Sequence, residues 1–345
     1  MEVVARVAQM YSSGGPSGGQ AVVVEVCCGT KSVSKIARAQ GHTVVTVDVD
    51  PDCIPRNPSA HADHFMVDLL GGPSEAPAGV VLGGVCLADL ELRLAAYVGQ
   101  GRVVLMHGSP PCDQVSVMNT TGPKAPGYPA KLARSLRIFH AFVDLASRFA
   151  VAWTLENPAT GRLWQPEWLR RHLSPEDRRL ADVPGISETK VVDYCQYGWP
   201  MKKATGLAFS SRAMKDAFAA RLCPGVAACD MCVPSSSSSR EGGAGVRAHA
   251  VSMTNLRGHY DCSTKHARYP IPPALVVHML QSLKVEAARV LRLLATANLN
   301  PPKRPTPHTP HTPHTPHTPH TPPTRTEEED ETRFACGPRF AAPVW

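Results

Sequence analysis

Four short apolar runs rich in valine constrain the fold of this chain more than any other feature. They span residues 22–26, 43–47, 102–107 and 151–155, and each stops at a turn that carries glycine, proline or a carboxylate. Continuous apolar runs of this length, separated by stretches with helical spacing, are typical of buried parallel strands joined by crossover helices. The sequence therefore predicts an α/β fold with a doubly wound sheet, whose ligands bind at the carboxyl edge of the strands.

The composition divides the rest of the chain into segments around this sheet. We expect a flexible Ser/Gly-rich lead-in over residues 1–20 and a sheet domain over residues 21–210. A small Cys-rich module follows over residues 211–268, and apolar positions at helical spacing predict a helix over residues 269–298 that packs back on the sheet domain. Residues 299–345 repeat Pro-His-Thr and then turn acidic. Such a tail cannot bury enough apolar surface to offset its ordering entropy, so we expect it to be disordered.

Charge and cysteine content restrict the partners and the compartment. The net charge is +7, and residues 301–345, with five basic and five acidic side chains, contribute none of it. The basic excess of the preceding residues suits a polyanionic partner. With no run of about 18 apolar residues and no secretory signal after Met1, we expect an intracellular protein of the nucleus or cytoplasm, without a membrane partner. The eleven cysteines are then expected to be thiols, metal ligands or catalytic groups rather than disulfides.

Two of the strand ends predict a nucleotide site. The first strand ends in the turn Cys27–Thr30, ahead of a predicted helix, and the second strand ends at Asp48. In doubly wound sheets, ligands bind where strand ends meet helix N-termini, and a carboxylate after the second strand is where a nucleoside ribose is held. The alternative is an α/β protein with an acidic surface turn.

The other two strand ends bring a thiol and a carboxyl group to the same edge. The third strand is followed by Pro110, Pro111 and Cys112, and because prolines fix the backbone dihedral φ, this turn is stiff and presents the cysteine in the ligand crevice. The fourth strand is followed by Glu156 and Asn157. A lone cysteine is more often a small buried apolar residue. Beside a carboxyl group at the adjacent strand end, it becomes a candidate nucleophile that acts with an acid on one substrate.

Five short motifs occur in order along the chain: Glu25–Thr30, Pro110–Cys112, Glu156–Pro158, Tyr197–Pro200 and Ile271–Leu275. This series resembles the motif series of the cytosine-C5 DNA methyltransferases, and Pro-Pro-Cys followed by Glu-Asn is its most specific part. The resemblance covers residues 21–210 and continues weakly at the fifth motif. It implies a Rossmann-like class I methyltransferase sheet, S-adenosylmethionine as cofactor, and DNA as partner, with the target cytosine flipped out because a stacked base cannot be reached. We expect the chain to act as a monomer.

The resemblance also assigns roles to single residues. Cys112 matches the nucleophile that adds to C6 of cytosine, and Glu156 matches the carboxyl group that protonates or hydrogen-bonds N3. Adding a thiolate to C6 makes C5 nucleophilic enough to take a methyl group, which explains why a cysteine is needed. Lys203 falls where the family has an arginine that contacts the base. The cofactor pocket is assigned to Cys27, Cys28, Gly29, Thr30, Asp48, Val49, Asp68 and Pro110.

The chain departs from the family pattern at several of these positions. Lys31 stands where a second glycine is common, and Lys203 keeps the charge of the usual arginine without its planar fork. Asp48 and Asp68 match the carboxylates that hold the ribose and the adenine amino group, but Val49 replaces the aromatic residue that stacks on the adenine. We interpret the chain as a divergent, viral or phage-like branch of the family. Two alternatives stay open, an RNA cytosine-C5 methyltransferase and a catalytically inactive nucleic-acid-binding protein.

The Cys-rich module lies where the family keeps its target-recognition region. Cys223, Cys229 and Cys232 are close in sequence, and three thiolates with one further nitrogen or sulfur ligand suit a closed, tetrahedral zinc site. His249 is the expected fourth ligand and Cys262 the alternative. Zinc would let this short module fold without a large core. The competing interpretation is that these cysteines are ordinary reduced thiols.

Overall fold

The computed structural model describes residues 21–72, 80–117, 119, 122–185, 187–199, 203–225, 228–234, 247–249 and 271–299. These residues all belong to one compact unit, Met1–Pro301. The predicted lead-in of residues 1–20, the predicted tail beyond residue 299 and the alternative zinc ligand Cys262 lie outside the described residues. In the part of the chain that is described, no helix combines the length and the apolar character that crossing a membrane requires.

The predicted α/β class is confirmed by a mixed, mostly parallel seven-stranded sheet with the order β3-β2-β1-β4-β5-β7-β6. The strands are β1 (Val22–Val26), β2 (Thr43–Asp48), β3 (His64–Met66), β4 (Val104–Gly108), β5 (Ala152–Pro158), β6 (Thr189–Asp193) and β7 (Ala204–Phe209). The strands β1 to β5 pair in parallel, whereas β7 runs antiparallel to both of its neighbours, β5 and β6. All four apolar runs predicted from the sequence form strands of this sheet.

The sequence pattern suggested a wholly parallel sheet, but β7 is antiparallel to its neighbours. The reason is that the connection between β6 and β7 is too short for a parallel crossover. Only residues 194–203 separate these two strands, whereas a parallel crossover takes a dozen or more residues. The chain therefore returns as an antiparallel neighbour. In this register β7 lies directly beside the carboxyl end of β5, where Leu207 pairs with Glu156.

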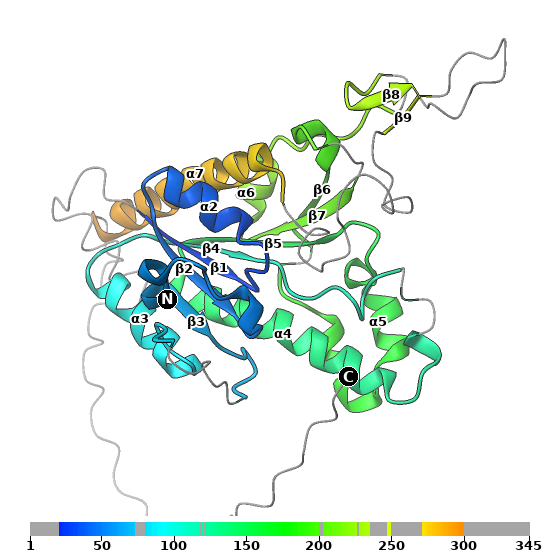
Figure 1. Ribbon diagram of the computed structural model, residues 1–345, viewed down its shortest axis with the longest axis horizontal. Helices are drawn as coiled ribbons and strands as arrows, with labels where there is room; N and C mark the ends of the chain where they lie inside the picture. The colour runs from blue at the N-terminus through cyan, green and yellow to red at the C-terminus, as the bar shows by residue number, and fades with distance from the viewer. Residues whose placement is uncertain are drawn as a thin grey trace, which may run out of the picture. The chain divides into compact units, whose positions relative to one another are not determined.

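Helices cover both faces of the sheet, which explains why its strands are apolar without alternation. Val22 and Val24 pack into one helical layer, and Val23 packs into the other. Figure 1 shows the two layers on either side of the strands. The first layer consists of α3 (Leu87–Gly99), α4 (Tyr128–Phe149) and α5 (Pro166–His172), and the second of α2 (Ser32–Ala39), α6 (Arg212–Ala217) and α7 (Pro273–Leu299).

The structure describes the closing helix and parts of the Cys-rich module. The predicted closing helix is α7, which buries Leu275, Met279 and Leu283 against the second face of the sheet. In the Cys-rich module, β8 (Cys232–Pro234) pairs antiparallel with β9 (Arg247–His249). These two short strands form a separate two-stranded sheet.

Candidate active site

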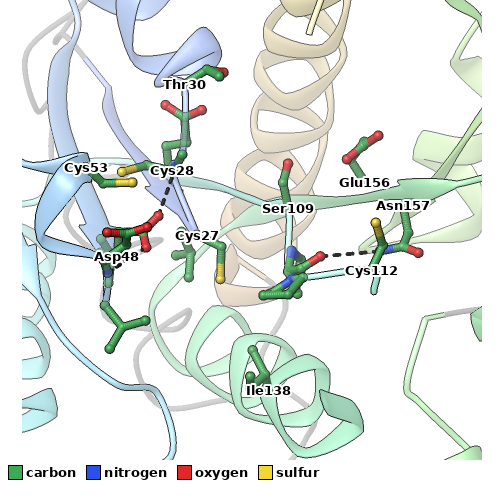
Figure 2. A pocket seen from close by; sticks show the side chains of 18 of the residues that line it. Cys27, Cys28, Thr30, Asp48, Cys53, Ser109, Cys112, Ile138, Glu156 and Asn157 are labelled. Atoms are coloured by element: carbon green, nitrogen blue, oxygen red, sulfur yellow. Dashed lines mark hydrogen bonds between the residues drawn. The ribbon is translucent and has the colours of Figure 1, made fainter. Parts of the chain in front are cut away.

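A cavity of about 650 Å³ lies at the carboxyl edge of β1, β2, β4 and β5. This volume is in the range of small-molecule sites, which are about 300–1,000 Å³. Figure 2 shows Cys27, Cys28 and Asp48 toward one end of the cavity and Cys112 and Glu156 toward the other. The cavity is lined by all eight residues predicted for the cofactor and all three predicted catalytic residues: Cys27, Cys28, Gly29, Thr30, Asp48, Val49, Asp68, Pro110, Cys112, Glu156 and Lys203.

The turn between β1 and α2 is held in an unusual backbone conformation. Cys27 and Lys31 have φ values of 54° and 56°, in the left-handed region that residues with a Cβ seldom adopt. Each such residue costs roughly 1–2 kcal/mol, and strain of this kind tends to be retained at functional sites. Lys31 thus adopts the conformation that a glycine would adopt more easily. The buried Glu25 side chain fixes the following helix, because its carboxyl oxygens accept the N–H groups of Val33 and Ser34 at 3.1 and 2.8 Å.

Asp48 ties the end of β2 to this turn. Its Oδ2 accepts the N–H of Gly29 at 2.9 Å, and its Oδ1 accepts the N–H of Asp50 at 3.1 Å. Because each carboxylate oxygen has two acceptor sites, both oxygens can accept one more donor from a ligand. Asp68 is engaged similarly, with the N–H of Leu70 on Oδ1 and the Arg134 guanidinium on Oδ2, each at 3.0 Å.

The turn after β4 is braced by its neighbours. Asn157 donates from Nδ2 to the carbonyl of Pro110 at 3.4 Å, and the Ser135 hydroxyl donates to the carbonyl of Pro111 at 3.5 Å. The N–H of Val115 closes a turn on the carbonyl of Cys112 at 3.0 Å. The two prolines and these three bonds leave the Cys112 side chain partly buried at the cavity wall.

The cavity disfavours the charged form of the Cys112 thiol. Burial and the neighbouring Glu156 raise the pKa of Cys112 to about 11, and the positive charge of Lys203 opposes the increase. The thiolate is the reactive form of cysteine. In this conformation Cys112 is therefore almost fully protonated at neutral pH, and reaction requires that its proton be removed.

We expect the alkylation rate of Cys112 to keep rising about tenfold per pH unit between pH 7 and pH 10. An ordinary thiol with a pKa of about 8.5 would level off above about pH 9.5. The measurement is the rate of iodoacetamide labelling of the Cys112 peptide by mass spectrometry, with the exposed Cys86 in the same digest as a reference. Replacing Lys203 by methionine should slow Cys112 labelling at every pH in this range, because the cation that lowers the pKa is removed. A plateau below pH 9 would contradict the environment described here.

Glu156 accepts three hydrogen bonds on a single oxygen. Its Oε1 receives the hydroxyl of Tyr194 at 3.2 Å, the Nζ of Lys203 at 3.3 Å and the hydroxyl of Thr205 at 3.4 Å. All four side chains are nine-tenths or more buried. Its Oε2 receives no hydrogen bond from the described residues. The network therefore fixes the carboxyl group and leaves one oxygen for a ligand in the cavity.

Lys203 forms a buried ion pair with Glu156. Its ammonium also lies 3.4 Å from the Tyr194 hydroxyl and 4.7 Å from the centre of the Tyr194 ring. Burial acts to lower the pKa of Lys203, but Glu156 and Tyr194 outweigh it and raise the pKa, so the side chain keeps its charge. A direct contact between Lys203 and a base stays a prediction.

Sequence reasoning missed three polar residues that organise this end of the cavity: Tyr194, Thr205 and His107. The Nδ1 of His107 lies 2.8 Å from Thr154 Oγ1, and its Nε2 lies 3.1 Å from Ser109 Oγ. Burial lowers the pKa of His107 to about 4, so this histidine is neutral at pH 7. The available signal for His107 was a polar residue directly after the apolar residues 103–106. For Tyr194 and Thr205 no local pattern was available, because their partner Glu156 is far away in sequence.

A cluster of cysteines lies apart from the cavity. The Sγ atoms of Cys195, Cys223 and Cys229 all lie within 4.8 Å of one another. Two of these were predicted as zinc ligands, whereas Cys195 was not, because it precedes the Cys-rich module. The other two predicted ligands, Cys232 and His249, are opposite each other in the register of β8 and β9. Their side chains lie outside the described part of the structure.

No family model matches the chain, and no curated protein gives a significant match. The function must therefore be inferred from the cavity and the motifs that form it.

Proposed function

We propose that this protein transfers a methyl group from S-adenosylmethionine to C5 of cytosine in DNA, as a divergent relative of the cytosine-C5 methyltransferases that its motifs resemble. The observation that carries the proposal is that a thiol and a carboxyl group, Cys112 and Glu156, line the same cavity as the strained turn and Asp48. A nucleoside-type cofactor and a second reactant could thus be held side by side.

The sheet topology supports a Rossmann-like class I methyltransferase fold. The order 3-2-1-4-5 of its first five strands is that of doubly wound nucleotide-binding sheets. The cavity lies at the carboxyl ends of β1 and β4, between which the strand order reverses, and this switch point is where such sheets bind ligands.

The residues at the Asp48 end fit S-adenosylmethionine. The remaining acceptor sites of Asp48 suit ribose hydroxyls, and those of Asp68 suit an adenine amino group. The Val49 side chain is 56% exposed and can offer an apolar contact where an aromatic ring would otherwise stack. When bound, S-adenosylmethionine supplies an electrophilic methyl group on a positively charged sulfur.

Cys112 and Glu156 would activate the base. The Cys112 thiol first loses its proton to solvent, and the thiolate then donates an electron pair to C6 of cytosine. As the ring electrons shift to N3, the protonated form of the Glu156 carboxyl group passes a proton from Oε2 to the nitrogen. C5 is then an enamine carbon and would bond to the methyl group as the methyl–sulfur bond breaks, with S-adenosylhomocysteine as the leaving group. A base next removes the C5 proton, the C5–C6 double bond returns, and Cys112 leaves as thiolate while N3 returns its proton to Glu156. Lys203 and Tyr194 hold the carboxyl group in place throughout.

Labelled methyl transfer tests this function. The protein is incubated with S-adenosylmethionine carrying a tritiated methyl group and a cytosine-containing DNA duplex, and the products are separated as nucleosides. We expect label in 5-methyl-2′-deoxycytidine only, and none with a matched duplex in which every cytosine is already methylated at C5. A matched RNA tests the RNA alternative. Label in an amino-methylated base would contradict the proposed chemistry.

A further inference from the structure

We propose that Cys195, Cys223 and Cys229 bind one structural metal ion of the zinc type, which attaches the Cys-rich module to the end of β6. The three sulfur atoms lie within 4.8 Å of one another, and Cys195 and Cys229 are almost fully buried. Zinc–sulfur bonds of about 2.3 Å in a tetrahedron place the sulfurs about 3.8 Å apart. Side-chain rotations that move the sulfur atoms by at most about 1 Å would therefore bring all three into ligand positions.

Backbone hydrogen bonds hold these cysteines near one another independently of any metal. The N–H of Cys223 donates to Asp193 Oδ2 at 2.8 Å, and the N–H of Asp193 donates to the carbonyl of Arg221 at 3.0 Å. These bonds attach the Cys223 segment to the end of β6, one residue before the turn that carries Cys195 (Tyr194–Tyr197). The chain then reverses at Gly225, which has a φ of 99° and accepts the N–H of Cys229 at 3.0 Å.

The side chain of Gln196 adds an N–H donor beside the cluster. The side-chain amide of Gln196 donates toward two of the sulfurs, Cys229 Sγ at 3.6 Å and Cys195 Sγ at 3.9 Å. Three thiolates around a divalent cation leave a net negative charge, and outer N–H donors of this kind stabilise such sulfur ligands. Sulfur-rich tetrahedral sites favour zinc among the common divalent metals.

The sequence supplies a fourth ligand. Cys232 follows Cys229 with two residues between them, which is the spacing of paired cysteines in structural zinc sites. In the β8–β9 register His249 pairs with Cys232, and His249 is the alternative fourth ligand. Four protein ligands would make a closed site that has a structural rather than a catalytic role. The proposed site does not depend on the methyl-transfer function.

Metal analysis of the full-length protein tests this site. We expect one zinc per chain in the wild type after dialysis, and a cobalt-substituted sample with the intense near-ultraviolet absorption of thiolate-to-cobalt charge transfer. Cys195→Ser is the most informative variant, because the spacing of the cysteines in the sequence gives no reason to expect Cys195 as a metal ligand. It should weaken zinc binding at least tenfold, as should Cys229→Ser, whereas the matched control Cys86→Ser should keep one zinc per chain. Cys195→His, which retains a ligand, should bind cobalt with a weaker charge-transfer band.

Three results would overturn the site. They are zinc-free wild type whose thiols react freely with a thiol reagent, full zinc retention in Cys195→Ser, and a disulfide among the three cysteines in non-reduced peptide mass spectra. The wild-type metal content and cobalt spectrum decide the matter even if a serine variant does not fold.

Discussion

Replacing Cys112 by serine should abolish methyl transfer while S-adenosylmethionine binding stays unchanged. The expected loss in kcat is about 10⁴-fold or more, the scale seen when a catalytic nucleophile is removed. The hydroxyl is a much weaker nucleophile than the thiolate, and Cys112 lies toward the opposite end of the cavity from Asp48. Serine is close in size to cysteine, so the surrounding packing should be kept. Tritium transfer to DNA and calorimetric titration with S-adenosylmethionine measure the two properties separately.

A mechanism-based trap provides the control. DNA that contains 5-fluorocytosine should form a complex with the wild type that survives denaturing electrophoresis, because fluorine at C5 cannot leave as a proton. Cys112→Ser should form no such complex. Substantial turnover by the serine variant would remove Cys112 from the mechanism.

Glu156→Gln should lower kcat by about 10²–10⁴-fold, the range associated with general acid catalysis, with much less effect on DNA affinity. Glutamine retains an oxygen that can accept the bonds from Tyr194 and Thr205, but it cannot supply a proton to N3. Stabilisation of N3 is needed mainly as charge develops in the transition state, so the loss should appear in kcat rather than in KM. Single-turnover kinetics with a fixed duplex measure the chemical step directly.

Thr205→Val is the matched control for Glu156. It removes only one of the three hydrogen bonds to Oε1 and keeps the size of the buried side chain. A fall of less than about tenfold is expected, since a single hydrogen bond contributes about 0.5–1.5 kcal/mol. If Glu156→Gln were no slower than Thr205→Val, the carboxyl group would have only a structural role.

The parts of the fold that depend on local pattern were predictable. The apolar runs at β1, β2, β4 and β5 and the helical spacing of α7 all carry their signal within a few residues, and the structure confirms them. The antiparallel place of β7 was not predicted. It depends on the length of one connection and on which edge of the sheet is open, and neither property is visible in the composition of the strand itself.

The residues of the candidate site were likewise predictable only where a local sequence pattern marks them. Strand ends collect at one edge of the sheet, so Cys112, Glu156 and Asp48 could be grouped from their positions after apolar runs. Tyr194 and Cys195 could not, because each acts on residues that follow or precede it by dozens of positions, and no spacing rule connects them. Lys203 was identified, but its buried contact with Glu156 arises only when β7 lies beside β5.

The short connection between β6 and β7 limits how this protein can diverge. Tyr194 and Cys195 are adjacent in it, and Lys203 is its last residue, so one stretch of chain holds the carboxyl group of Glu156 on one side and the cysteine cluster on the other. An insertion or deletion there would displace both at once. A change in the length of this connection should therefore disturb the cysteine cluster and the hydrogen bonds to Glu156 together, whereas a point substitution can remove one feature and leave the other.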